Sequence, residues 1–225
     1  MKKILRSILL FFGLQPKSNY YSFVTRATVI LEKEYGHFES CKQQSCIKGS
    51  EIIPWITYPA LEYISQIDFS DKTLLEWGAG NSSIYFSKRF KHLTSIEHNK
   101  NWFVKIKEFG LKNQNLIFAD KKNYLSVVQD LETKFDVILI DAILRDDCVA
   151  IAPALLNNNG LIILDNSDRH PGLCEKLRKD NFIQVDMHGF GPINNYTWTT
   201  TFFFTRMFDF NPINIQPIIP IGGGY

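Results

Sequence analysis

A regular alternation of short apolar runs with amphipathic segments, between residues 73 and 186, is the feature that most constrains the fold. Short apolar runs are typical of buried strands, and segments with apolar residues every three or four positions are typical of helices. Repeated strand–helix units need right-handed crossovers, which make the strands parallel and place helices on both faces of the sheet. We therefore expect an α/β protein with a doubly wound, mostly parallel sheet.

The pattern predicts seven strands and the helices between them. The predicted strands are Thr73–Trp77, Leu93–Glu97, Leu116–Asp120, Phe135–Asp141, Leu161–Asp165, Phe182–Asp186 and Thr197–Arg206. The predicted helices are Ser82–Phe90, Trp102–Phe109, Tyr124–Leu131, Asp146–Leu156 and Gly172–Lys179. No helical pattern separates the last two strands, because residues 186–196 ("DMHGFGPINNY") hold two glycines and a proline. The seventh strand must therefore return through a loop and run antiparallel.

The remaining segments predict the domain organisation of the 225 residues. We expect a helical extension over 1–49, one cofactor-binding domain over 50–208 and an irregular Pro/Gly-rich tail over 209–225. Residues 1–14 form an amphipathic pattern with Lys and Arg beside it, too short to span a bilayer and without a signal cleavage site. This pattern fits either peripheral contact with an anionic membrane or packing on the protein itself or a partner.

The charge and the cysteine content limit the kinds of binding partner and the cellular compartment that we expect. The net charge is only +2, which does not indicate a nucleic-acid-binding surface. The four cysteines lack zinc-site spacing, and free thiols are typical of a cytoplasmic protein. We expect a cytoplasmic chain, with or without membrane association, that acts on a small molecule or glycan. The pattern does not determine the oligomeric state.

A carboxylate followed by a glycine turn ends the first predicted strand, in "LLEWGAGNSS" (residues 74–83). Gly78 and Gly80 fit the start of a dinucleotide-binding fingerprint, but Ser83 stands at its third glycine position. Glu76 would repel a pyrophosphate and attract an ammonium group. An NAD-dependent oxidoreductase is therefore the less favoured alternative.

Acidic residues also end the second and third predicted strands. Glu97 lies about 20 residues beyond the glycine turn, where a carboxylate accepts ribose hydroxyls, and Asp120 could reach an adenine edge. Each acid alone is also compatible with a solvated strand end or a helix cap. Together, on the edge where open α/β sheets bind ligands, they indicate a cationic nucleoside without phosphate.

These motifs resemble those of the class I S-adenosylmethionine-dependent methyltransferases. "LLEWGAGNSS" is similar to their first motif, "TSIEHN" to their second acidic motif and "FDVILIDA" to their fourth, and the antiparallel seventh strand is a mark of the same superfamily. The resemblance implies a methyltransferase that binds S-adenosylmethionine. The site residues that it implies, from the methionine end through the glycine turn and ribose to adenine, are Glu76, Asp141, Gly78, Gly80, Ser82, Glu97, His98 and Asp120.

A metal site is a further prediction. Asp141, Asp165 and Asn166 end neighbouring strands, and their oxygens could share Mg²⁺ or another divalent cation. The arrangement resembles the catechol and caffeoyl-coenzyme A O-methyltransferases, although Leu144 stands where those enzymes have a lysine. The alternative is structural, with Asp165 capping the strand exit, Asn166 shaping the turn and a local ion pair following.

The acceptor side is less strongly specified. Asp141 and His170 are the predicted catalytic residues, and His188 is a second candidate base, although both histidines are also compatible with plain loop positions. Trp55 could cover the cofactor or belong to the core, and the loop 189–198 is expected to close over the acceptor. An N/D-P-P-Y/F motif, typical of amino-group acceptors, is missing after the fourth strand, so we expect O-methylation of a hydroxyl. A non-catalytic binding domain with the same fold is the remaining alternative.

Overall fold

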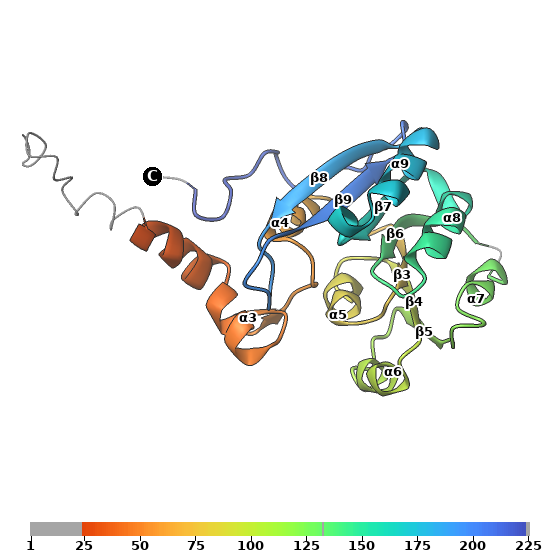
Figure 1. Ribbon diagram of the computed structural model, residues 1–225, viewed down its shortest axis with the longest axis horizontal. Coiled ribbons are helices and arrows are strands. Elements are labelled where there is room, and N and C mark those ends of the chain that lie inside the picture. Colours follow the sequence, from red (N-terminus) through yellow and green to blue (C-terminus); the bar gives the residue numbers. More distant parts are fainter. Residues whose placement is uncertain (1–23, 132, 224–225) are drawn as a thin grey trace, which may run out of the picture.

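The structure, a computed structural model, describes residues 24–131 and 133–223 (Figure 1). Its main sheet has seven strands in the order β5-β4-β3-β6-β7-β9-β8. The strands are β3 (Thr73–Trp77), β4 (His92–Glu97), β5 (Gln114–Phe118), β6 (Phe135–Ile140), β7 (Leu156–Asp165), β8 (Ile183–Gly189) and β9 (Trp198–Phe204). The helices around it are α4 (Tyr58–Ser65), α5 (Asn81–Ser87), α6 (Lys100–Lys107), α7 (Ser126–Gln129), α8 (Arg145–Leu155) and α9 (Pro171–Lys179).

The sheet topology confirms the predicted fold class. Strands β3 to β7 pair in parallel, and β9 pairs antiparallel with both β7 and β8. The seventh strand in the sheet therefore inserts between the fifth and the sixth. Because β3 and β6 are adjacent at the centre, chain order reverses between them, and the loops after β3 and β6 diverge there to leave room for a ligand.

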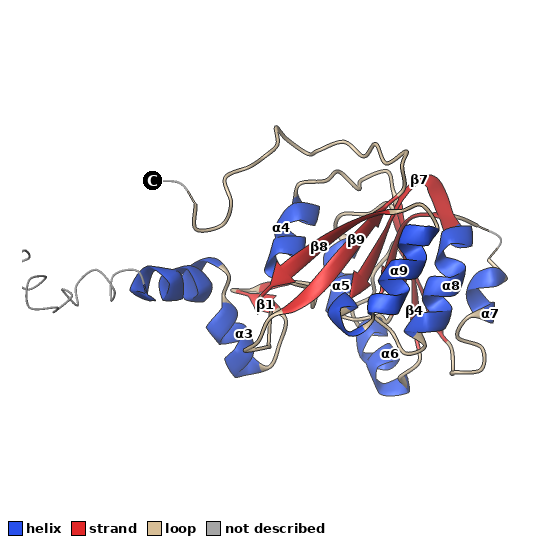
Figure 2. Cartoon of the chain, turned by 45° about the horizontal axis from the view of Figure 1, so that its top comes forward, coloured by secondary structure: helices blue, strands red, loops and turns tan. Residues whose placement is uncertain are grey.

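Helices cover both faces of the sheet (Figure 2), and an apolar layer lies between the sheet and the helices on each face. Leu75, Ile138 and Ile162 point to one face, where they pack with residues of α7, α8 and α9. Leu74 and Val137 point to the other face and pack with residues of α4 and α5. This two-sided burial explains why the central strands are almost entirely apolar, and it holds the carboxyl ends of β3, β4 and β6 on one rigid edge.

Strand β7 differs from the prediction at its start. It begins at Leu156, where the prediction ended a helix, and includes the polar residues 157–159, which the prediction placed in neither a helix nor a strand. The β6–β7 register shifts between Phe135 and Val137, and Asn157 Nδ2 donates to Asp136 Oδ1 at 2.8 Å across this irregularity. A Cβ at Gly160 would lie 2.7 Å from the Asp136 carbonyl oxygen, so the close approach requires glycine.

The N-terminal part of the described chain is a helix over 24–29 that continues into η1 (Ile30–Glu34), followed by α3 (His37–Gln43) and a short hairpin of β1 (Ile47–Lys48) and β2 (Glu51–Ile52). The helix extends away from the sheet in Figure 1. Cys46, Ile53 and Tyr58 form a small apolar cluster against Phe190 and Ile193 of the β8–β9 loop. The amphipathic pattern of residues 1–14 lies outside the described residues.

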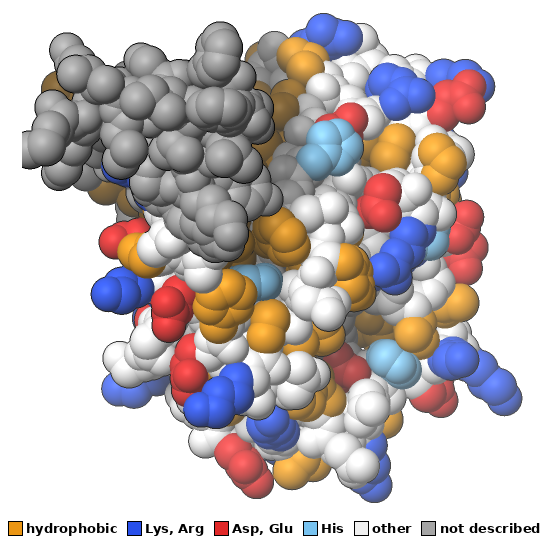
Figure 3. Space-filling model, turned by 60° about the vertical axis from the view of Figure 1, so that its left-hand side comes forward, with side chains coloured by type: hydrophobic (Ala, Val, Ile, Leu, Met, Phe, Trp, Pro, Cys, Tyr) orange, Lys and Arg blue, Asp and Glu red, His pale blue; other side chains and the backbone are white. Residues whose placement is uncertain are grey.

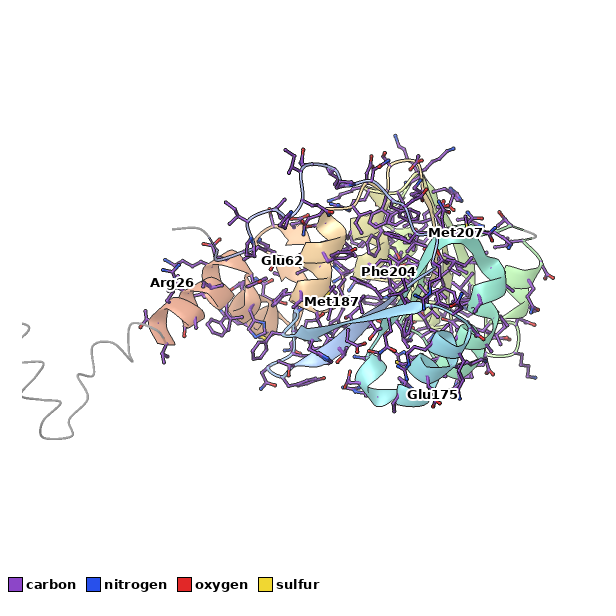
Figure 4. The ribbon with its side chains drawn as sticks, turned by 90° about the horizontal axis from the view of Figure 1, so that it is seen from above. Arg26, Glu62, Glu175, Met187, Phe204 and Met207 are labelled. Atoms are coloured by element: carbon purple, nitrogen blue, oxygen red, sulfur yellow. The ribbon has the colours of Figure 1, made fainter. Side chains whose placement is uncertain are left out.

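The C-terminal segment after β9 forms no regular element over residues 209–223 beyond an isolated bridge between Ile67 and Pro212. It runs along α4, where Glu62, labelled in Figure 4, accepts the Ile221 N–H at 3.1 Å. Of the helices that the structure describes, none combines the length and the apolar character needed to cross a bilayer.

Candidate cofactor and acceptor site

A cavity of about 740 Å³ opens at the carboxyl ends of β3, β4 and β6. Its walls come from the glycine turn, the β4–α6 loop, the β6–α8 loop and two segments outside the sheet, residues 44–46 and 55–56. On the face of the molecule that Figure 3 shows, acidic, basic and apolar side chains are interspersed. The cavity lies on the edge where the sequence predicted cofactor binding.

The glycine turn gives the cavity its floor. Gly78 has φ +100°, and a Cβ there would lie 2.1 Å from the Asp141 carbonyl oxygen, so only glycine fits. At Gly80 a Cβ would lie 3.3 Å from Trp102 Nε1, which itself donates to the Ala79 carbonyl at 2.5 Å. The turn therefore presents bare backbone to the cavity, as the close approach of a ligand requires.

Glu76 lies beneath this turn and does not line the cavity. It is fully buried, and its carboxylate accepts the hydroxyls of Ser82, Ser83 and Ser95, at 2.8 Å for Ser82 and 2.6 Å for Ser95. Ser83 also accepts the Gly80 N–H at 3.0 Å. Burial raises the pKa of Glu76 to about 7, although the three hydroxyls oppose this. Its described contacts support the turn from below, and direct contact with an ammonium group stays a prediction.

Glu97 lines the cavity at the end of β4. Its side chain is 3% exposed, and Oε1 accepts the Asn99 N–H at 2.6 Å. Burial raises the pKa of Glu97. The neighbouring His98 also lines the cavity, with Nδ1 at 3.3 Å from Glu97 Oε1 and its ring against the edge of Tyr124. The structure therefore brings Glu97, His98, Gly78, Gly80 and Ser82 together around one space.

Asp120 is not part of this group. It is exposed, does not line the cavity, and accepts the N–H groups of Lys122 and Asn123, each at 3.0 Å. The side chain therefore caps the turn after β5. This is a structural role, of the kind that the sequence also allowed for a single acid at a strand end. Contact between Asp120 and an adenine stays a prediction.

Asp141 lines the other end of the cavity, where it is paired with an arginine. Arg145 Nη2 donates to Asp141 Oδ1 at 2.5 Å and to Asn166 Oδ1 at 3.2 Å. A guanidinium nitrogen therefore lies between two of the three predicted metal ligands. Arg145 is the first residue of α8, and the preceding Leu144 has a left-handed backbone with φ +56°.

Asp165, the third predicted ligand, is 3% exposed and already bonded. Its Oδ1 accepts Trp198 Nε1 at 3.0 Å and Thr200 Oγ1 at 2.6 Å. Burial raises the pKa of Asp165 to about 7, and the nearby Asp141 carboxylate adds to the effect. In this arrangement the three side chains do not fit a divalent ion, and the described part of the chain holds no group of three His, Cys, Asp or Glu side chains placed for one.

The two candidate histidines lie away from the cavity. His170 is half-buried between a short 3₁₀ turn and α9, and does not line the cavity. His188 is on the edge strand β8, where Nδ1 lies 2.6 Å from Thr199 Oγ1. Asp168 accepts the Thr199 N–H at 3.0 Å. A catalytic role for His170 stays a prediction, which the geometry does not support.

Several lining residues escaped the sequence interpretation. Trp102 and Lys105 come from α6, and Cys46 comes from the loop before β1. Burial raises the pKa of the Cys46 thiol to about 12, so it is neutral at ordinary pH. The acidic motif at Glu97 could have indicated the first two, because the helix that follows a ligand-binding strand end starts at the same edge. No local pattern marks Cys46, since it reaches the cavity only through tertiary packing.

Comparison with solved structures agrees with this architecture. The precorrin-6Y C5,15-methyltransferase of Geobacter metallireducens GS-15 superposes with a TM-score of 0.53 and 16% sequence identity, over 65% of this chain and 87% of that chain. SMU.1697c of Streptococcus mutans, in complex with SAH, gives 0.50 and 12% over 66% and 99%. Cofactor-bound Rv0187 from MTB gives 0.50 and 16% over 65% and 77%.

These likenesses establish the fold as the Rossmann-like fold of class I methyltransferases, as the sequence motifs predicted. A scan against protein-family models and a search of curated proteins gave no match.

Proposed function

We propose that the protein is an S-adenosylmethionine-dependent methyltransferase that acts on an oxygen of a small molecule. The observation that carries the proposal is the joint presence of Glu97 and the glycine turn on one cavity wall, at the carboxyl edge of the sheet. A carboxylate there accepts ribose hydroxyls, and the bare turn at Gly78 and Gly80 admits a ligand at backbone distance. The proposed acceptor atom is an oxygen, either of a hydroxyl, as the sequence analysis expected, or of a carboxylate, because residues 141–144 lack the motif of amino-group acceptors.

The residues present fit the cofactor. Glu97 and His98 would hold the nucleoside half, and Trp102 would keep the turn in place through its bond to the Ala79 carbonyl. Ser82 lines the cavity and bonds to Glu76, so the buried carboxylate can act on a ligand through this hydroxyl. When bound, the cofactor supplies an electrophilic methyl group on a sulfonium. The chain would contribute by positioning the two reactants in line and by excluding water.

The two carboxyl groups beside the glycine turn, Glu97 in the cavity wall and Glu76 beneath the turn, argue against a dinucleotide. A pyrophosphate on this turn would lie close to Glu76 and Glu97 and would need a phosphate cradle of free N–H groups. The Gly80 N–H is instead bonded to Ser83 Oγ at 3.0 Å. The experiment must therefore distinguish binding of an S-adenosylmethionine-type cofactor from binding of NAD⁺.

Calorimetry with S-adenosylhomocysteine and with NAD⁺ tests the proposal. We expect the wild-type protein to bind the former and not the latter. Glu97→Ala should weaken S-adenosylhomocysteine binding by about tenfold or more, because hydrogen bonds to a charged group contribute about 1.5–3 kcal/mol. Glu108→Ala, which removes an exposed carboxylate at the end of α6, is the matched control and should leave the affinity unchanged. Binding of NAD⁺ alone, or equal affinities of the two variants, would overturn the assignment.

A further inference from the structure

Arg145 is a cation fixed at the acceptor end of the cavity. Its single nitrogen Nη2 joins the carboxylate of Asp141, which follows β6, to the amide oxygen of Asn166, which follows β7. The Arg145 side chain is only 19% exposed. A divalent ion in this site would be coordinated by these two oxygen atoms. The guanidinium and the ion would therefore compete for the same two atoms.

The local backbone holds this cation in place. Leu144 and Asn166 both have left-handed conformations, with φ +56° and +54°. Such conformations are unfavourable for residues other than glycine and persist where the surrounding structure fixes them, often at functional sites. Here they flank the two ends of the Arg145 contact. The first residue of α8 is thereby turned back toward Asp141, four positions earlier in the chain.

Arg145 also has unused hydrogen-bonding capacity. Its Nε is buried and finds no acceptor among the described residues, although the residue lines the cavity. A buried donor on a charged group is costly when it is left unpaired, and an oxygen atom of a bound molecule would pair it. A guanidinium binds carboxylate oxygens with particularly good geometry. Trp55, Ile56 and Ile193 line the same cavity and would suit an apolar body on that molecule.

We propose that Arg145 takes the place of the divalent metal ion in this site and binds the carboxylate of an acceptor with an apolar body. The choice of acceptor rests on the proposed function, whereas the exclusion of the metal does not. In the transfer, a carboxylate oxygen forms the new bond to the methyl carbon with its own electron pair, and the sulfur–carbon bond breaks with its pair left on sulfur. No proton has to be removed, which agrees with the position of His170 outside the cavity.

Titration with Mn²⁺ alone, followed by calorimetry, tests the exclusion of the metal. We expect no binding to the wild-type protein, binding to Arg145→Ala, and loss of that binding in the double variant Arg145→Ala/Asp141→Asn. Arg169→Ala removes an exposed arginine three residues after Asn166 and is the matched control, which should not bind Mn²⁺. If Arg145→Ala does not fold, the Mn²⁺ titration can be made with Arg145→Met, which keeps most of the side-chain volume. Wild-type binding that Asp141→Asn removes, or no gain on loss of Arg145, overturns the proposal.

Benzoate and benzamide, added to the protein saturated with S-adenosylhomocysteine, test the recognition of a carboxylate. The two probes share an apolar ring and differ in charge. We expect benzoate to bind at least about tenfold more tightly than benzamide, and Arg145→Gln to abolish the difference. Equal binding of the two probes to the wild-type protein overturns this part. Failure of S-adenosylhomocysteine to bind would instead refute the proposed function and leave the Mn²⁺ result standing.

Discussion

Replacement of Glu76 by glutamine should change how the stability of the fold depends on pH. The carboxyl group is fully buried, and burial raises its pKa from the ordinary 4.5 to about 7. Below pH 4.5 the group is protonated in the folded and the unfolded chain alike. As the pH rises from there to about 7, the unfolded chain loses this proton first, so ionisation favours unfolding. The stabilising contribution of the neutral carboxyl is therefore present at low pH and lost as the pH rises through the folded pKa.

The interval between the unfolded and the folded pKa of Glu76 determines how much the free energy of unfolding changes with pH. Each pH unit between the two pKa values corresponds to about 1.4 kcal/mol, so the range from 4.5 to about 7 gives about 3 kcal/mol. Urea unfolding of the wild-type and Glu76→Gln proteins, measured from about pH 4.5 to about pH 8, would give both free energies of unfolding. Their difference, wild type minus variant, should fall by about 3 kcal/mol over this range. Subtraction removes the other groups that titrate, Asp165 among them.

Glu108 is an exposed carboxylate at the end of α6, so Glu108→Gln is the matched control. The free energy of unfolding of this variant should depend on pH as that of the wild type does. Parallel curves for wild type and Glu76→Gln would refute the reasoning. They would mean that the three serine hydroxyls offset burial completely and that the pKa of Glu76 in the folded protein stays at its ordinary 4.5.

Three further predictions concern the cavity. Gly78→Ala should destabilise the fold by at least about 2 kcal/mol and abolish S-adenosylhomocysteine binding, since its Cβ would lie 2.1 Å from the Asp141 carbonyl; thermal melts and calorimetry would detect both, and normal binding would contradict the described turn. Trp102→Phe should weaken the same binding about fivefold, in line with one neutral hydrogen bond to Ala79, and an unchanged affinity would show that this bond does not support the site. His170→Ala should leave the calorimetric affinity unchanged, because His170 does not line the cavity, and a clear loss would return it to the site.

The sequence was sufficient to predict the sheet and the strand ends that meet at one edge of the cavity. Both depend on local order: apolar runs specify buried strands, and a strand end followed by a turn places Glu97 and Gly78 on one edge whatever the rest of the chain does. Asp120 was assigned to the same group by position, but its turn gave it nearer donors in the N–H groups of Lys122 and Asn123. A strand-end position indicates the edge of the sheet, not the direction of the side chain.

The end of the cavity at Asp141 was not predictable in the same way. Asp141 and Asn166 do lie together, as the strand order implied, but the residue between them is Arg145, whose direction depends on the left-handed backbone at Leu144. A leucine in that conformation is not anticipated by any propensity. Cys46 likewise reaches the cavity through the packing of a segment that precedes the sheet.

Ser40 joins residues 44–46 to the β8–β9 loop, two parts of the cavity wall that are far apart in the sequence. Its hydroxyl accepts the N–H of Ile193, 153 positions away in the chain, at 2.9 Å. The same hydroxyl donates to the Ser45 carbonyl at 2.6 Å. One end of the cavity is built from residues 78–105, which are near neighbours in sequence, whereas the opposite end forms only when the chain before the sheet meets the loop before its last strand. Local opening of the Ser40 hydrogen bonds would therefore expose one end of the cavity, while the end built from residues 78–105 stays intact.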